Sequence, residues 1–240
     1  MLADIHANLA AFTAVLDDIE RRGGVDGLWC LGDVVGYGPD PGRCIELLRQ
    51  HEHVCVAGNH DLAAAGKLDI TSFNPDAAFA CRWTAQQLSP EDIDYLGNLP
   101  TTVEKEALTL LHGSPRDPIW DYLVSVGSAQ ENFAYFESKY CLVGHSHVPL
   151  VFKQEEGGNC SFQEFSPGIG LVLGDSRLII NPGGVGQPRD GDPRASYAIY
   201  DNSSSVVRLY RVPYDINATQ IKMVKNNLPM RLVVRLEQGV

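Results

Sequence analysis

The chain has 240 residues, which is enough for one well-buried core, and its 44% hydrophobic and 20% charged residues are ordinary for a globular protein. Its formal net charge of −11 argues against a stable complex with nucleic acid or an anionic membrane, because both are bound through clustered Lys and Arg. No apolar stretch is long enough to cross a bilayer, and no basic segment followed by an apolar run indicates a secretory signal. The six cysteines lack CxxC spacing, so we expect free thiols and a cytoplasmic location.

The first half of the chain alternates helical periodicity with short apolar runs, which is typical of an α/β protein. Asn8 can cap a helix whose apolar residues recur at helical spacing, and two glycines at 23 and 24 end it. The other elements expected here are a short strand at 1–3, a strand at 28–31, a loop at 36–39, a helix at 41–48, a strand at 53–57 and two helices within 75–98, the second capped by Ser89.

In the second half, short strands dominate. We expect strands at 101–103, 107–111, 140–143, 149–153, 171–173, 178–181, 196–201 and 205–212, and a helix at 128–138. Residues 154–168 are polar and rich in glycine, so they predict an exposed loop. The tail at 215–240 predicts two helices, separated near Pro229, that pack on a single domain spanning residues 1–240.

Side chains that bind metals follow the predicted strands. They are Asp4 and His6, then Asp33, then Asn59 with His60 and Asp61, then His112, and finally His145 and His147. Because strand ends of α/β sheets converge on one crevice, we expect these side chains to lie close together. Mixed nitrogen and oxygen ligands suit Mn, Fe, Zn, Ni or Co, with no preference among them visible in the residues. Seven ligands, namely Asp4, His6, Asp33, Asn59, His112, His145 and His147, are too many for one ion and right for two ions that share a carboxylate.

Five ordered blocks carry these residues: D-x-H at 4–6, G-D at 32–33, G-N-H-D at 58–61, H-G at 112–113 and G-H-S-H at 144–147. In this order they resemble the calcineurin-like metallophosphoesterase superfamily. The segments G-Y-G-P at 36–39, N-P-G at 181–183 and Q-P-R at 187–189 resemble a bacterial branch related to diadenosine tetraphosphatases and Ser/Thr protein phosphatases.

The resemblance implies a four-layer αββα sandwich with two mixed β-sheets and a metal centre at the strand ends. It implies that one divalent ion is held by Asp4, His6 and His147, and the second by Asn59, His112 and His145. Asp33 would bridge the two ions, and manganese is the metal expected at both positions. His60 would lie beside the substrate, where it stabilises the phosphoryl group or protonates the leaving oxygen, and Asp61 would orient His60.

Three residues in loops near these blocks are candidates for substrate binding: Tyr37, Arg116 and Arg189. For each of them, packing or solvation at the surface is an alternative interpretation. Only three residues precede Asp4, fewer than a typical strand needs, so we also expect that the natural chain begins several residues upstream.

The expected function is hydrolysis of a phosphodiester, a nucleotide or a dinucleoside polyphosphate by a metal-bridging hydroxide, as the resemblance implies. The expected partner is a small phosphate-ester or nucleotide substrate, with a homo-oligomer left open. Three alternatives stand beside it: a phosphomonoesterase or protein phosphatase, a non-catalytic metal-binding scaffold for protein partners, and a dinuclear amide or lactone hydrolase.

Overall fold

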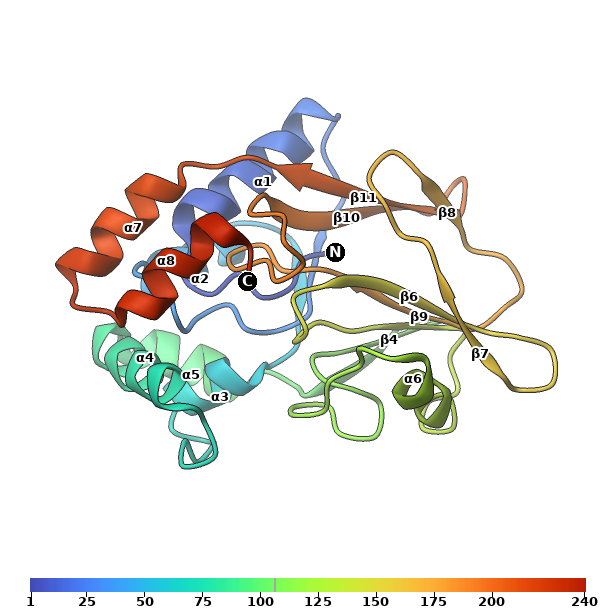
Figure 1. Ribbon diagram of the computed structural model, residues 1–240, viewed down its shortest axis with the longest axis horizontal. Coiled ribbons are helices and arrows are strands. Elements are labelled where there is room, and N and C mark those ends of the chain that lie inside the picture. The colour runs from blue at the N-terminus through green and yellow to red at the C-terminus, as the bar shows by residue number, and fades with distance from the viewer. Residues whose placement is uncertain (106) are drawn as a thin grey trace.

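The computed structural model describes residues 1–105 and 107–240, with most of the helices gathered at one end and a β-hairpin extending at the other (Figure 1). The first half contains α1 (Leu9–Arg21), β1 (Leu28–Cys30), α2 (Pro41–Arg49), β2 (His53–Cys55), α3 (Asn59–Ala64), α4 (Pro75–Gln87) and α5 (Pro90–Gly97). The side chain of Asn8 accepts a hydrogen bond from the backbone of Ala11, and Ser89 caps α5 in the same way, so both predicted caps are confirmed.

The second half contains β3 (Thr102–Lys105), β4 (Leu108–Leu111), α6 (Val126–Asn132), β5 (Tyr140–Leu142), β6 (Pro149–Gln154), β7 (Cys160–Gln163), β8 (Gly170–Val172), β9 (Leu178–Pro182), β10 (Ala195–Asp201), β11 (Val206–Val212), α7 (Ile216–Lys225) and α8 (Met230–Gln238). The predicted pair of C-terminal helices on either side of Pro229 is therefore confirmed. Residue 107, with which the predicted strand began, precedes β4, and residue 106 lies outside the described residues.

Three predicted segments are wrong. The expected loop at 154–168 contains β7, which pairs with β6 in a hairpin. The helix expected at 128–138 ends at Asn132, because Arg177 donates hydrogen bonds to the carbonyl oxygens of Phe133 and Phe136, which then do not serve a continuing helix. The segment after β2, expected as a loop, is the short helix α3.

The strands form mixed sheets. A six-stranded sheet has the order β3-β4-β5-β9-β6-β7, in which β4, β5 and β9 are parallel and the remaining pairs are antiparallel. A parallel pair β1-β2 and an antiparallel set β10-β11-β8 are joined by the first residues of the chain. The backbone nitrogen of Leu2 donates to Trp29, and the oxygen of Met1 accepts from Ala198. Residues 1–3 thus form a bridge between strands where a short strand was expected.

Side chains on the six-stranded sheet alternate between two hydrophobic clusters. Leu110, Leu142 and Ile180 pack with residues of β10 and β11 on one face. Leu111, Cys141 and Ile179 pack with α6 on the other face. A third cluster joins α1 and α2 to β1 and β10, and includes Phe12, Ile45 and Tyr197. Because β1, β2, β4 and β5 all belong to parallel pairs, the loops after them meet at one end of the structure.

The C-terminal helix α8 buries one face and exposes the other. Leu232, Val233 and Leu236 pack against Tyr37 and α4, whereas Met230 and Val234 are exposed. Among the described residues, no helix is both long and apolar enough to cross a membrane.

We predict that Phe12→Ala destabilises the protein by about 3–5 kcal/mol, because Phe12 is fully buried and truncation leaves a cavity between α1 and the β1–β10 layer. The matched control is Phe79→Ala, since Phe79 lies on a helix with 42% of its surface exposed and should cost about 1 kcal/mol or less. Urea unfolding curves give both values. Equal losses for the two variants would contradict the assignment of Phe12 to the core.

Candidate metal centre

The loops that carry the predicted ligands adopt an unusual backbone conformation. Five of these residues have a left-handed φ: Asp4 (54°), His6 (47°), Asp33 (55°), His145 (64°) and His147 (59°). For residues other than glycine this conformation costs about 1–3 kcal/mol each and is found where function requires it. Local sequence patterns do not predict this strain.

One side-chain cluster consists of Asp4, His6 and His147, all fully buried. The Nδ1 atoms of the two imidazoles lie 3.0 Å from the oxygen of Val35 and 2.6 Å from that of Gln187. A carbonyl oxygen only accepts, so Nδ1 carries the proton in each ring and Nε2 keeps its lone pair. These two Nε2 atoms lie 3.1 Å apart, and that of His147 lies 3.5 Å from Asp4 Oδ1.

A second cluster consists of Asn59, His112 and His145. The Nδ1 atom of His112 lies 2.7 Å from the oxygen of Leu31, and Nε2 of His145 lies 3.2 Å from that of Trp120. Their remaining ring nitrogens lie 3.0 Å apart, and His112 Nε2 is 3.1 Å from Asn59 Oδ1. Here too, atoms that accept hydrogen bonds face each other.

The carboxylate of Asp33 lies between the two clusters. Its Oδ2 atom is 3.6 Å from Nε2 of His6 and 3.4 Å from Nε2 of His112, while Oδ1 accepts a hydrogen bond from the backbone of His60. Burial opposes the negative charge of Asp33, but the nearby imidazoles, His112 first, hold its pKa well below the usual range. Asp33 is therefore an anion that both clusters share.

The residues present fit a cation in each cluster. Oδ2 of Asp4 is buried without a hydrogen-bond partner, which is costly unless a cation binds it. Burial lowers the pKa of His145 to about 3 and those of His6 and His147 well below the usual range, so these imidazoles are neutral. Burial also raises the pKa of Asp4 to about 7, a shift that a bound cation would oppose. Neutral imidazoles and carboxylates are the forms that bind metal ions.

The two predicted catalytic residues do not contact each other as expected. The Nδ1 atom of His60 lies 3.2 Å from the thiol of Cys81, on α4. The carboxylate of Asp61 instead accepts hydrogen bonds from the backbone nitrogens of Asp33, Gly58 and Val35, at 2.7, 3.0 and 3.1 Å. Within residues 1–105 and 107–240, Asp61 thus bonds to backbone groups rather than to His60, and its expected role in orienting that imidazole stays a prediction. Neighbouring residues of a helix do not face each other, and both belong to α3.

Of the three candidates for substrate binding, the structure brings two to the centre. Tyr37 packs against the rings of His60 and His6, with centroids 4.3 and 4.6 Å away, and Arg189 lies 5.8 Å above the Tyr37 ring. Arg116 is instead paired with Asp121 and Glu131, at 2.7 and 3.0 Å. These carboxylates hold Arg116 away from the residues that line the two cavities at the centre, and its assignment to the substrate site stays a prediction.

A cavity of about 240 Å³ opens beside the two clusters. Besides ligands of both clusters it is lined by four aromatic side chains: Tyr37, Phe73, Trp120 and Tyr122. Tyr122 stacks on His145 with ring centroids 3.9 Å apart. Sequence reasoning missed Phe73 here and missed Cys81 beside His60, because no local motif marks either.

Comparisons with known proteins agree with this geometry. Residues 1–205 match the Calcineurin-like phosphoesterase superfamily domain. The chain is 40% identical to an uncharacterised protein of Methanocaldococcus jannaschii, over 100% of this chain and 97% of the relative. The crystal structure of a metallophosphoesterase from Sphaerobacter thermophilus shows 46% identity and a TM-score of 0.90, covering 100% of this chain and 97% of that chain.

A hypothetical protein from Pyrococcus horikoshii, 20% identical, shares the fold with a TM-score of 0.81, covering 100% of this chain and 97% of that one. The fold and the buried His/Asp clusters therefore define a metal-dependent phosphoesterase. The chain belongs to the calcineurin-like phosphoesterase superfamily.

We predict that manganese binds more tightly as the pH rises from about 7 to about 9. Burial disfavours a proton on His112, but the charges of Asp33 and Asp4 raise its pKa to about 9, so at neutral pH a proton must leave Nε2 before metal binds. The affinity should rise by about tenfold per pH unit below that pKa. Calorimetric titration in buffers of different ionisation enthalpy measures both the affinity and the released proton. Binding without proton release at pH 7 would contradict this assignment.

Proposed function

We propose that the protein hydrolyses a phosphodiester, a nucleotide or a dinucleoside polyphosphate. The observation that carries the proposal is the pair of buried clusters that share the Asp33 carboxylate, with Nε2 of His6 and of His112 on either side of Oδ2. Two divalent ions bound there would activate a water nucleophile and stabilise the charge on the transferred phosphoryl group. Manganese is the metal we propose, since the mixed nitrogen and oxygen ligands suit it.

The proposed ligands follow the two clusters. Asp4, His6 and His147 would hold one ion, Asn59, His112 and His145 would hold the other, and Asp33 would be shared by both. The backbone carbonyls that accept from the imidazoles fix the ring tautomers and directions, which favours binding without rearrangement.

His60 serves the substrate in this proposal. Burial lowers its pKa to about 4, so the imidazole is neutral near pH 7. If the thiol of Cys81 donates to Nδ1, the remaining ring proton sits on Nε2 and can be donated to a phosphoryl oxygen. Of the two roles expected for His60, this favours stabilising the phosphoryl group over protonating the leaving oxygen.

Asp61 acts on the position of the bridging ligand. Its three hydrogen bonds join the loop after β1 to the start of α3, and one of them is donated by the backbone of Asp33 itself. We therefore propose Asp61 as a positioning residue for Asp33.

The aromatic lining of the cavity supports a nucleotide-like substrate, because flat bases stack on aromatic side chains. A segment of 63 residues is also 36% identical to a symmetrical bis(5'-nucleosyl)-tetraphosphatase of Pseudomonas putida, although it spans only 25% of this chain and 22% of that protein.

We further propose that residues 1–240 form one domain built as a four-layer αββα sandwich. The two hydrophobic clusters on opposite faces of the six-stranded sheet and the packing of α1 on β10 support this arrangement. The six free cysteines, five of them buried, support a reducing compartment such as the cytoplasm.

The first test is hydrolysis of bis-p-nitrophenyl phosphate and of p-nitrophenyl phosphate, with manganese or with chelator. Asp33→Asn should lower turnover by about a hundredfold or more, because it removes the charge shared by both clusters. The matched control is Asp175→Asn, a fully exposed aspartate paired only with Lys139, which should retain full activity.

A faster rate on the diester than on the monoester would support a phosphodiesterase, and the reverse ratio would replace it with a phosphomonoesterase. If metal-loaded wild-type protein cleaves neither compound, the proposed hydrolase function is wrong, and the non-catalytic metal-binding scaffold becomes the favoured alternative.

A second test concerns the position of His60. Gly36 has a φ of +90°, and a Cβ atom added there would overlap the imidazole of His60. We predict that Gly36→Ala lowers kcat for bis-p-nitrophenyl phosphate by at least about tenfold.

The control is Gly168→Ala, because Gly168 has a φ of +88° with no atom near an added Cβ. Both variants carry similar backbone strain, about 1–2 kcal/mol, which thermal unfolding should detect in each. Equal activity of the two variants would show that the position of His60 does not matter.

A further inference from the structure

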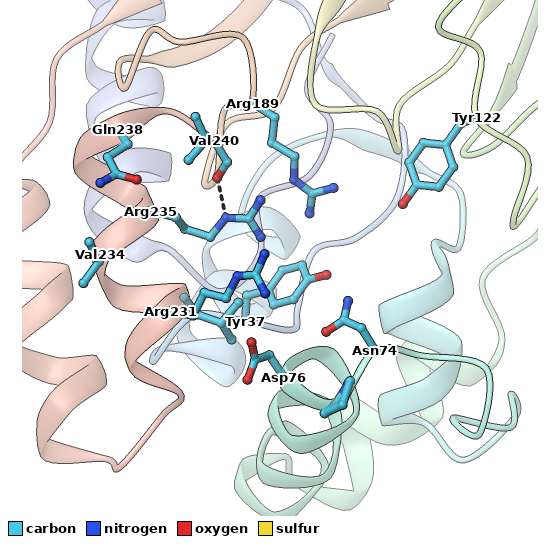
Figure 2. A pocket seen from close by; sticks show the side chains of 12 residues that line it. Tyr37, Asn74, Asp76, Tyr122, Arg189, Arg231, Val234, Arg235, Gln238 and Val240 are labelled. Atoms are coloured by element: carbon cyan, nitrogen blue, oxygen red, sulfur yellow. Dashed lines mark hydrogen bonds between the residues drawn. The ribbon is translucent and has the colours of Figure 1, made fainter.

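A second, larger cavity of about 820 Å³ lies beside the metal centre (Figure 2). It shares Tyr37, Asn74, Tyr122 and Arg189 with the smaller cavity that touches the metal clusters. Its other wall is α8, which contributes Arg231 and Arg235 among other residues. The two cavities therefore adjoin at these four residues, and one molecule can occupy both.

Three guanidinium groups point into this cavity, those of Arg189, Arg231 and Arg235 (Figure 2). Within the described residues, none of them pairs with an Asp or Glu side chain, although Asp76 also lines the cavity; Arg235 donates to the oxygen of Val240 (Figure 2) and Arg189 to the side chain of Gln187. The neighbouring Arg194 and Arg211, by contrast, are paired with Asp192 and Asp190. In a chain with a net charge of −11, three arginines that face one cavity without an Asp or Glu partner indicate a local site for an anion.

The arrangement of these arginines is unfavourable without a ligand. Arg231 and Arg235 lie four residues apart on one face of α8, where like charges repel. Burial and the charges of Arg189 and Arg231 lower the pKa of Arg235 to about 10, which leaves it charged at neutral pH. The Nε atom of Arg189 is buried without a hydrogen-bond partner. An anion in the cavity would relieve all three costs.

Packing holds α8 in place against the metal centre. Leu232, Val233 and Leu236, on its buried face, contact Tyr37 and α4, and the Tyr37 ring lies against His60 and under Arg189. The N-terminus of α4, at Asn74 and Pro75, also borders the cavity and adds the positive end of a helix dipole.

We propose that this basic pocket, formed by Arg189, Arg231 and Arg235, binds a second phosphate group of the substrate. The natural substrate is then a phosphate ester or anhydride with at least one phosphate besides the one that is hydrolysed. Arginine suits this role because its planar group can donate two hydrogen bonds to one phosphate. The inference rests on the proposed phosphoesterase function, since the first phosphate is the one bound at the metal clusters.

Two inorganic probes, phosphate and tripolyphosphate, test the proposal in protein kept with excess manganese. Phosphate reports the metal centre alone, whereas tripolyphosphate can also reach the arginines. The double variant Arg231→Gln/Arg235→Gln should reduce the preference for tripolyphosphate over phosphate, measured by calorimetry, by roughly tenfold to several hundredfold. An unchanged preference would overturn the proposal.

Single variants guard against a folding defect. Arg231 is exposed, so Arg231→Gln should fold normally and show part of the loss, while Arg231→Lys, which keeps the charge, should restore most of the preference. The control is Arg43→Gln, since Arg43 is 71% exposed and paired with Glu46 on α2, and it should bind both probes as the wild type does.

Turnover of bis-p-nitrophenyl phosphate, measured in parallel, separates this inference from the proposed function. Wild-type turnover together with an unchanged probe preference in the double variant would remove only the second-phosphate pocket. Absence of turnover, with a probe preference that still depends on the two arginines, would support the anion pocket and remove the phosphoesterase.

Discussion

The structure depends on an unfavourable electrostatic arrangement at its centre, where histidine ring nitrogens and Asp carboxylate oxygens lie close together and buried from water. Four imidazoles each donate one proton to a backbone carbonyl and direct the other nitrogen toward Asp33, Asp4 or one another. No donor among the described residues satisfies Oδ2 of Asp4. Such an arrangement is costly in a low dielectric and becomes favourable only when cations are bound.

The backbone around the centre follows from the same constraint. To bring short loops from β1 and β5 and the first residues of the chain within hydrogen-bonding distance, five ligand positions adopt left-handed backbone conformations. Asp61 helps to hold them by accepting three backbone hydrogen bonds, so a buried carboxylate that contacts no ligand side chain still fixes the geometry of Asp33. The strained backbone of Asp33 and the carboxylate of Asp61 that stabilises it are thus neighbours in space, although they are distant in the sequence.

Much of the fold and the centre could be predicted because the signals are local. The ligand blocks lie directly after short apolar strands, and the helix caps at Asn8 and Ser89 are visible within four residues. What could not be predicted depends on contacts between distant segments or on elements too short to show a period. His60 and Asp61 are consecutive residues of the six-residue helix α3, so their side chains point in different directions. The partner of His60, Cys81, comes from another helix. Asp121 and Glu131 fix the position of the Arg116 side chain, and the sequence around Arg116 does not predict these ion pairs.

The position of α8 has a consequence for how such proteins diverge. The match to the family model ends at residue 205, so the two His/Asp clusters lie inside it and Arg231 and Arg235 lie beyond it, although full-length relatives also cover residues 206–240. In the proposed pocket, Arg231 and Arg235 then come from a different stretch of the chain than the metal clusters, while Arg189 comes from the same one. Exchange of the C-terminal helices α7 and α8 would therefore change the proposed second-phosphate pocket without changing the residues of the two His/Asp clusters. For engineering, Arg231 and Arg235 on α8 are the positions to vary when a different specificity is wanted, since β11 (Val206–Val212) belongs to the core.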